Sequence, residues 1–76
     1  MISFDIRLSK MDDVRRFVAI TSASPVDVDL AAGRYLVDAK SIMGIFSLDL
    51  LKPITLQAHG GDTDELFAAL DRFIVK

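Results

Sequence analysis

The sequence predicts an α/β domain of the α+β kind: an open-faced β-sandwich with a four-stranded antiparallel sheet and three helices on one face. Some segments alternate apolar and polar residues, as half-buried strands do, and others repeat apolar residues at helical spacing. These segments follow one another in the order β-α-β-β-α-β-α. Since every strand has one apolar and one polar face, helices are needed on one side of the sheet only.

The first strand is predicted over residues 2–8, where even-numbered positions are apolar and odd-numbered positions polar. A helix is predicted from Lys10 to Ile20. Ser9 is its expected N-cap, and Asp12, three residues later, is the expected capping-box partner. The apolar side of this helix consists of Met11, Val14, Phe17 and Val18.

A hairpin is predicted in the middle of the chain. The polar segment 21–25 ends in proline and breaks the first helix. Residues 26–30 alternate strictly, Ala32-Gly33 is typical of a tight turn, and residues 34–38 form the return strand. A second helix then starts behind Ser41 and ends between Asp49 and Lys52.

The last part of the chain predicts a strand and a helix. Pro53 ends the second helix and precedes a strand over residues 54–58, and His59-Gly60-Gly61 is a predicted loop. Asp62 or Thr63 caps the last helix. Its apolar residues, at positions i, i+1, i+4, i+7 and i+8, are Leu66, Phe67, Leu70, Phe73 and Ile74.

Length and composition limit the class of protein. Seventy-six residues predict a single domain over 1–76, which buries roughly 60% of its unfolded surface. The absence of cysteine excludes disulfides and cysteine-ligated zinc. No segment has the composition of a membrane span or a signal peptide, and a net charge of −2 disfavours nucleic acid as a partner. We expect a cytoplasmic protein without a membrane or nucleic-acid partner.

His59, the only histidine, has no histidine or cysteine partner for a metal site. We interpret it as an ordinary loop residue, and the nearby Asp62 and Asp64 as acids that favour the start of a helix. Gly60-Gly61 before a helix is a pattern that can hold a phosphate, but the acids that follow would repel an anion.

The first helix carries charged residues without a recognisable catalytic set. Lys10, Arg15 and Arg16 form a small basic face, which solvation explains in the simplest interpretation. Asp12 and Asp13 project about 100° apart and cannot work as a catalytic pair. The pattern predicts no enzyme, no metal and no cofactor.

Ser41 is the strongest candidate for a functional residue. As an N-cap, its hydroxyl accepts a backbone N–H and stabilises the helix by about 1 kcal/mol relative to alanine. A phosphate at this position would meet unsatisfied N–H groups and the positive end of the helix dipole, so Ser41 is also a candidate phosphorylation site.

The residues behind Ser41 are more apolar than one buried stripe of a short helix requires. We expect Met43 and Phe46 to stay partly exposed, as a docking surface would need. Gly44 lowers helix propensity by roughly 1 kcal/mol relative to alanine, which suits a short, adaptable helix.

The segment from Lys40 to Leu48 resembles the regulatory-serine segment of HPr, the histidine-containing phosphocarrier of the bacterial sugar phosphotransferase system. The resemblance runs from Phe17 to the C-terminus and includes residues 27–30. It implies the βαββαβα open-faced sandwich.

The same resemblance fails at the start of the first helix. Family members carry a Gly-x-His-x-Arg-Pro motif there, whose histidine accepts the phosphoryl group. This chain has residues 8–13, Leu-Ser-Lys-Met-Asp-Asp, with Lys10 nearest the place of the histidine. The acids Asp12 and Asp13 stand where the family keeps positive charge.

The resemblance therefore implies a variant without the phosphoacceptor histidine, similar to catabolite-repression HPr. In such a variant, HPr kinase/phosphorylase phosphorylates the serine, and the product docks on a LacI-type transcription regulator. The implied acceptor here is Ser41, and the implied docking face is Ile42, Met43, Phe46 and Ser47, with Arg15 and Arg16 nearby. Two alternatives stay open: phosphoryl transfer through His59 or Asp12 within the phosphotransferase system, and a binding domain in which Ser41 is only a cap.

Overall fold

The computed structural model describes residues 2–61 and 63–75. The elements are β1 (Ile2–Ile6), α1 (Met11–Ala23), β2 (Asp27–Ala32), β3 (Tyr35–Asp38), α2 (Ile42–Phe46), β4 (Ile54–His59), α3 (Asp64–Leu70) and a 3₁₀ helix (Asp71–Phe73). Their order confirms the predicted β-α-β-β-α-β-α arrangement. Among the described residues, no helix is long and apolar enough to cross a membrane.

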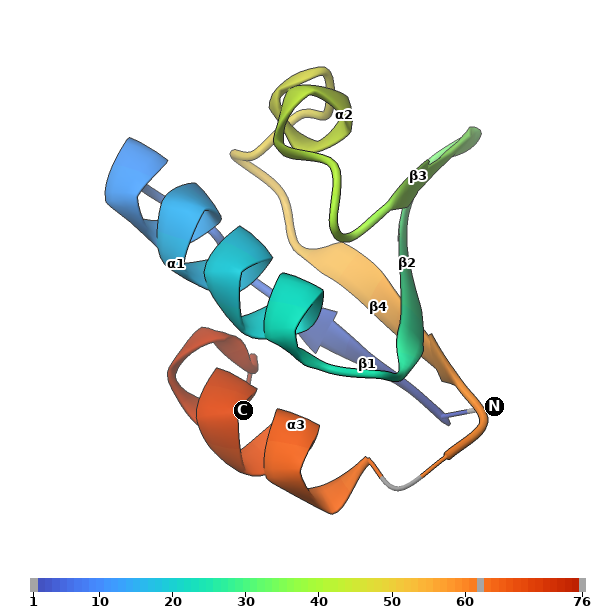
Figure 1. The fold of residues 1–76 in the computed structure, drawn as a ribbon. Helices are drawn as coiled ribbons and strands as arrows, with labels where there is room; N and C mark the ends of the chain where they lie inside the picture. Colours follow the sequence, from blue (N-terminus) through green and yellow to red (C-terminus); the bar gives the residue numbers. More distant parts are fainter. Residues whose placement is uncertain (1, 62, 76) are drawn as a thin grey trace.

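The four strands form one antiparallel sheet in the order β1-β4-β2-β3. All three α-helices cover the same face of this sheet, with α1 between α2 and α3 (Figure 1). The other face is open, so the predicted open-faced sandwich is confirmed.

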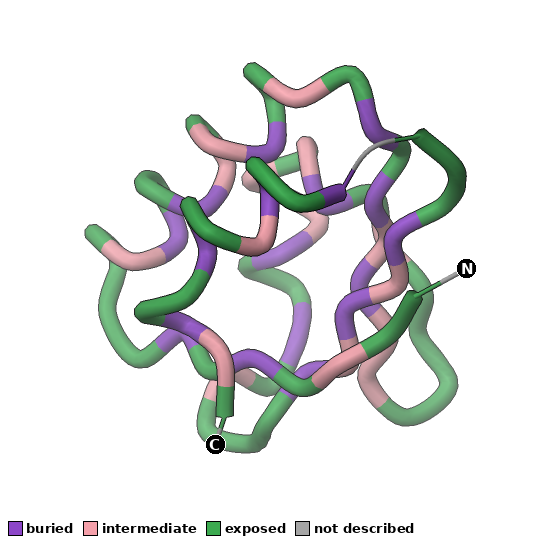
Figure 2. The backbone as a smooth tube through the Cα atoms, turned by 90° about the horizontal axis from the view of Figure 1, so that it is seen from below, coloured by how far each residue is buried: buried purple, intermediate pink, exposed green. Residues whose placement is uncertain are grey.

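The core lies between the sheet and the helices. Phe4, Leu56 and Leu30 are aligned across β1, β4 and β2, and the last two are completely buried. Phe17 of α1 is also fully buried and packs edge-to-face on Phe73 at a centroid distance of 6.1 Å. Figure 2 shows how buried and exposed positions alternate along the chain. The apolar side of each alternating segment therefore supplies this core.

The start of α1 differs from the prediction. The N-cap is Lys10 rather than Ser9, and the acid that accepts the cap hydrogen bonds is Asp13 rather than Asp12. The helix also extends three residues beyond the predicted end at Ile20. It continues because the buried Thr21 hydroxyl is satisfied by the carbonyl oxygens of Val18 (3.2 Å) and Ala39 (2.9 Å).

Boundaries in the middle of the chain also move. The hairpin turn is Gly33-Arg34 rather than Ala32-Gly33, because Gly33 supplies the positive φ of 61°. β2 consequently runs to Ala32 rather than Leu30. α2 ends at Phe46, short of the predicted 49–52, where the N–H groups of Ser47 and Leu48 bond to carbonyls three residues back and close the last turn.

The C-terminal part holds two further corrections. His59 belongs to β4 and pairs with Asp27 of β2, so it is not a loop residue. The predicted last helix is divided: α3 ends at Leu70, Phe73 lies on the 3₁₀ helix, and Ile74 bridges to Ile6. Thr63 is the N-cap of α3 without a side-chain cap bond, whereas Asp62, the alternative cap, lies outside the described residues.

Candidate functional site

Ser41 occupies the N-cap of α2, as predicted. Its backbone is extended (φ −103°, ψ 105°), and its Oγ accepts the N–H of Gly44 at 3.2 Å. Its own N–H donates to the carbonyl of Asp38 at 3.0 Å, which ties the start of α2 to the end of β3. The residue is exposed. The hydroxyl is therefore both a structural cap and accessible to a modifying enzyme.

Gly44 leaves room for this arrangement. A Cβ added at Gly44 would lie 3.2 Å from the Oγ of Ser41 and 3.4 Å from the Cβ of Val37. The first separation is tight and the second is an ordinary contact, so a larger residue would press mainly on the Ser41 cap. The glycine thus allows Ser41 to fold over the first turn of α2.

The apolar residues of α2 divide between core and surface. Ile45 is completely buried, and Ile42 is half-buried against the core. Met43 is 76% exposed and Phe46 40% exposed, which confirms the predicted exposure of both side chains. They are three residues apart and therefore neighbours on one side of the helix. We call Met43 and Phe46 the α2 apolar surface.

Two further exposed residues, Ser47 and Leu51, follow the α2 apolar surface in the sequence. Ser47 follows directly as the exposed C-cap, and its Oγ donates to the carbonyl of Gly44 at 2.6 Å. Leu51, in the segment that leaves α2, is 88% exposed. The exposure of Leu51 was not predicted, because the predicted helix extended past residue 49. The sequence pattern that could have indicated it is the pair Leu50-Leu51, which follows a short helix whose buried face has no room for further apolar side chains.

The two arginines of α1 lie on different sides of that helix. Arg16 shares a helical stripe with Ile20 and Ala23, which line a pocket together with residues of α3. Arg15 projects about 100° from Arg16 around the helix, next to Val18 and on the exposed side of α1. Of the predicted pair, Arg16 is the one on the stripe that lies toward α3.

Lys10, predicted from the resemblance to lie nearest the place of the family histidine, is an exposed N-cap residue of α1. Next to it, the Asp13 carboxylate accepts hydrogen bonds from Ser9 N–H (3.1 Å), Ser9 Oγ (3.0 Å) and Lys10 N–H (3.2 Å). Desolvation pushes the pKa of Asp13 upward, but the bonds from Ser9 and Lys10 outweigh it, and the pKa is lowered. Asp13 is thus committed to capping α1.

Asp13→Ala is expected to destabilise the protein by about 1 kcal/mol at neutral pH, because it leaves the N–H groups of Ser9 and Lys10, directly before α1, without their acceptor. Because the folded-state pKa of Asp13 lies below the unfolded value of about 3.9, this stability is present above pH ~4 and is lost as pH falls through the folded-state pKa. Urea unfolding of wild type and variant at pH 7 and at pH 2–3 measures it. Asp12→Ala is the matched control, and an undiminished Asp13 effect in acid would contradict this account.

Positive charge gathers at the start of α1 in a way that the sequence did not predict. Arg7 from the end of β1, Lys10, and Arg72 from the 3₁₀ helix line one pocket there. None of these three cations forms a salt bridge with another described residue. Arg72 lies over the ring of Phe73, 5.7 Å from its centroid. The charge brought by Asp12 and Asp13 is therefore offset by residues distant in sequence.

His59 lies in an acidic setting. Its Nε2 is 3.0 Å from Oδ2 of Asp29, and the two side chains are 40% and 35% exposed. Asp27, Asp38 and Lys40 line the same depression on the open face of the sheet, where the carboxylates outnumber the one lysine. This negative surrounding opposes the approach of a phosphoryl group to His59. No group of three or more histidine, cysteine, aspartate or glutamate side chains suited to a metal occurs in residues 2–61 and 63–75.

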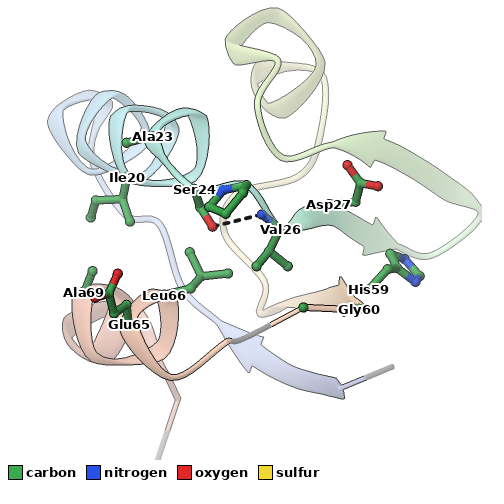
Figure 3. A pocket seen from close by; sticks show the side chains of 12 residues that line it. Ile20, Ala23, Ser24, Val26, Asp27, His59, Gly60, Glu65, Leu66 and Ala69 are labelled. Carbon is green, nitrogen blue, oxygen red and sulfur yellow. Dashed lines mark hydrogen bonds between the residues drawn. The ribbon is translucent and has the colours of Figure 1, made fainter.

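A pocket of about 630 Å³ lies between the C-terminal end of α1, the start of β2 and α3 (Figure 3). Ile20, Val26 and Leu66 give it apolar walls, and the N–H of Val26 donates to Ser24 Oγ at 3.2 Å. Its rim includes Gly60-Gly61 together with acidic side chains and no lysine or arginine. The pocket is thus poorly suited to a phosphate, and Ser41 does not line it.

Both the sequence and the structure are similar to those of known proteins. A profile of the family described as "PTS HPr component phosphorylation site" matches residues 13–76. HPr-C-His from Thermoanaerobacter tengcongensis has a similar structure, with a TM-score of 0.75 and 28% identity, over 93% of this chain and 85% of that one. A phosphocarrier protein HPr from Bacillus anthracis str. Ames gives a TM-score of 0.76 and 25% identity, over 97% and 96% of the two chains. No curated protein sequence matches.

Proposed function

Because the chain belongs to the HPr family of the bacterial phosphotransferase system, we propose that it is a regulatory, non-enzymatic member of that family whose switch is Ser41. The observation that carries the proposal is the exposed Ser41 cap directly before the α2 apolar surface. A serine that can gain charge beside exposed apolar side chains is the arrangement by which phosphorylation changes a protein interface.

Phosphorylation fits the local structure of Ser41. The N–H of Gly44, which now donates to Ser41 Oγ, points to where a phosphate oxygen would lie, and the helix dipole favours negative charge there. The phosphate would therefore be added without unfolding α2. Docking is proposed through Ile42, Met43, Phe46 and Ser47, with Arg15 of α1; Arg16, on the stripe toward α3, is the weaker member of the original set.

The partners follow from this role. We propose HPr kinase/phosphorylase as the modifying enzyme and a LacI-type regulator as the protein that recognises phosphorylated Ser41, both in the cytoplasm. The start of α1 supports a role other than carrying a phosphoryl group, since its N-cap is Lys10 and the only histidine of the sequence is His59. Neither nucleic acid nor a membrane is a proposed partner.

Two phosphorylation reactions test the proposal. With HPr kinase/phosphorylase and ATP, we expect one phosphate per chain, mapped to Ser41 by mass spectrometry and absent in Ser41→Ala. With enzyme I and phosphoenolpyruvate, we expect none. Acid-labile phosphate on His59, or hydroxylamine-labile phosphate on Asp12, in the second reaction would establish the phosphocarrier alternative. No phosphate in either reaction would establish a binding domain in which Ser41 only caps α2. Ser47→Ala is the matched control for the first reaction.

A further inference from the structure

The sheet has one covered edge and one open edge. At β1, the C-terminal segment pairs with the strand: Arg7 N–H donates to Phe73 O at 2.8 Å, Val75 N–H donates to Asp5 O at 2.9 Å, and Ile6 bridges to Ile74. At the other edge, no described segment pairs with the outer side of β3. In Figure 1 the β2–β3 hairpin extends away from the helices. β3 is therefore available to another strand.

The backbone groups of β3 alternate in direction. The residues that flank a two-residue turn bond to each other, so Tyr35 points its N–H and C=O toward β2. Ala39, four residues later, also points its N–H toward β2, where it donates to Val28 O at 2.9 Å. Leu36 and Asp38 consequently direct their backbone groups outward. An added antiparallel strand would use the N–H and C=O of Leu36 and the N–H of Asp38, because the C=O of Asp38 already accepts the N–H of Ser41.

The side chains of this edge are not those of a protected edge strand. Leu36 is 63% exposed and Tyr35 68% exposed, although edges are usually guarded by charges of one sign that repel a second copy. Here the flanking charges have opposite signs: Arg34 precedes the strand and Asp38 ends it. Two copies of this edge would attract each other.

We propose that two copies of this chain associate through β3 strands paired antiparallel about Leu36, which joins the two sheets into one of eight strands. In this register Leu36 faces Leu36 of the partner subunit, and Arg34 faces Asp38 of the partner subunit, at both ends of the pairing. The outward N–H and C=O of Leu36 then bond reciprocally across the two-fold axis, and Asp38 N–H donates to the carbonyl of Arg34 of the partner subunit.

The position of Asp38 supports this register. Its Oδ1 accepts the N–H of Lys40 at 2.8 Å, which holds the carboxylate in place. Its other oxygen accepts no hydrogen bond from the described residues. A second copy is favoured over another protein because residues 34–38 are complementary to themselves: reversing the strand puts opposite charges together and apolar residues together.

The association is expected to be weak and dependent on concentration, because one short strand pair buries less than a standard interface. It goes beyond the proposed function, since it uses neither the Ser41 hydroxyl nor the α2 apolar surface. Sedimentation equilibrium between about 10 µM and 1 mM measures it, and we expect a reversible monomer–dimer equilibrium with no larger species.

Charge reversal tests the register. Arg34→Glu and Asp38→Lys are each expected to raise the dimer dissociation constant at least tenfold, because like charges then meet at both ends. An equimolar mixture of the two variants restores opposite charges in every pair and is expected to associate at least as tightly as wild type. Lys52→Glu, an exposed charge change outside β3, is the control.

Leu36→Pro provides a second test that does not depend on charge. It removes an outward N–H while the bonds between β2 and β3 remain, so the chain is expected to fold, by circular dichroism, and to stay monomeric. A wild type that is monomeric at all concentrations would overturn the proposal. So would a dimer that Arg34→Glu and Leu36→Pro leave intact, or a variant mixture that fails to associate.

Discussion

Met43→Asp is expected to weaken docking of the Ser41-phosphorylated protein on the proposed LacI-type regulator by about 30-fold or more, which corresponds to about 2 kcal/mol. At 76% exposure, Met43 contributes little to the core. The free energy of unfolding should therefore change by less than about 0.5 kcal/mol. Isothermal titration calorimetry measures the first effect, and urea unfolding measures the second.

Val75→Asp is the matched control for this substitution. Val75 is an exposed apolar residue, 44% exposed, at the C-terminal side of the molecule, away from α2 (Figure 1). The same new charge there should leave docking unchanged. Equal affinity of wild type and Met43→Asp would remove the α2 apolar surface from the interface.

Phe17→Ala is expected to destabilise the protein by about 3–5 kcal/mol, enough to unfold a large fraction of a domain of this size at 37 °C. Phe17 is completely buried, and its ring packs on Phe73, so its removal opens a cavity between α1 and the 3₁₀ helix. Thermal and urea unfolding measure the effect.

Ala19→Gly, at an exposed position of the same helix, is the control for a change in helix propensity alone and is expected to cost about 1 kcal/mol. A loss from Phe17→Ala no larger than that of Ala19→Gly would contradict the described core.

Patterns that depend on local geometry could be predicted from the sequence. The strict alternation of residues 26–30 and the spacing around Leu66 and Leu70 identified a strand and a helix, and the apolar excess behind Ser41 identified exposed Met43 and Phe46. Each of these inferences needs only the period of one element and the capacity of its buried face.

The ends of helices could not be predicted where the local sequence fits two different boundaries. Phe73 fits the helical pattern of α3, but it reaches the core from a 3₁₀ turn, because Ile74 must lie alongside β1. Ser9 has the better residue type for an N-cap than Lys10. The cap moves by one residue because Asp13 reaches back to bond both N–H groups.

The parts of the candidate site that depend on tertiary structure were beyond the sequence. The neighbours of Arg15 and Arg16, which project about 100° apart, can be assigned only once the positions of α2 and α3 are known. Arg7 and Arg72 join Lys10 in one pocket although more than sixty residues separate the first two. The pairing of His59 with Asp29 likewise depends on the register between β2 and β4.

The central claim is that phosphorylation of Ser41 turns α2 into a docking surface, and one affinity comparison tests it most directly. The regulator is titrated with the protein before and after phosphorylation on Ser41 by HPr kinase/phosphorylase, with phosphate-free Ser41→Ala as a third sample. We predict at least tenfold tighter binding of the phosphorylated protein and equal, weak binding of the other two. Equal affinity for the phosphorylated and unphosphorylated protein would contradict the account.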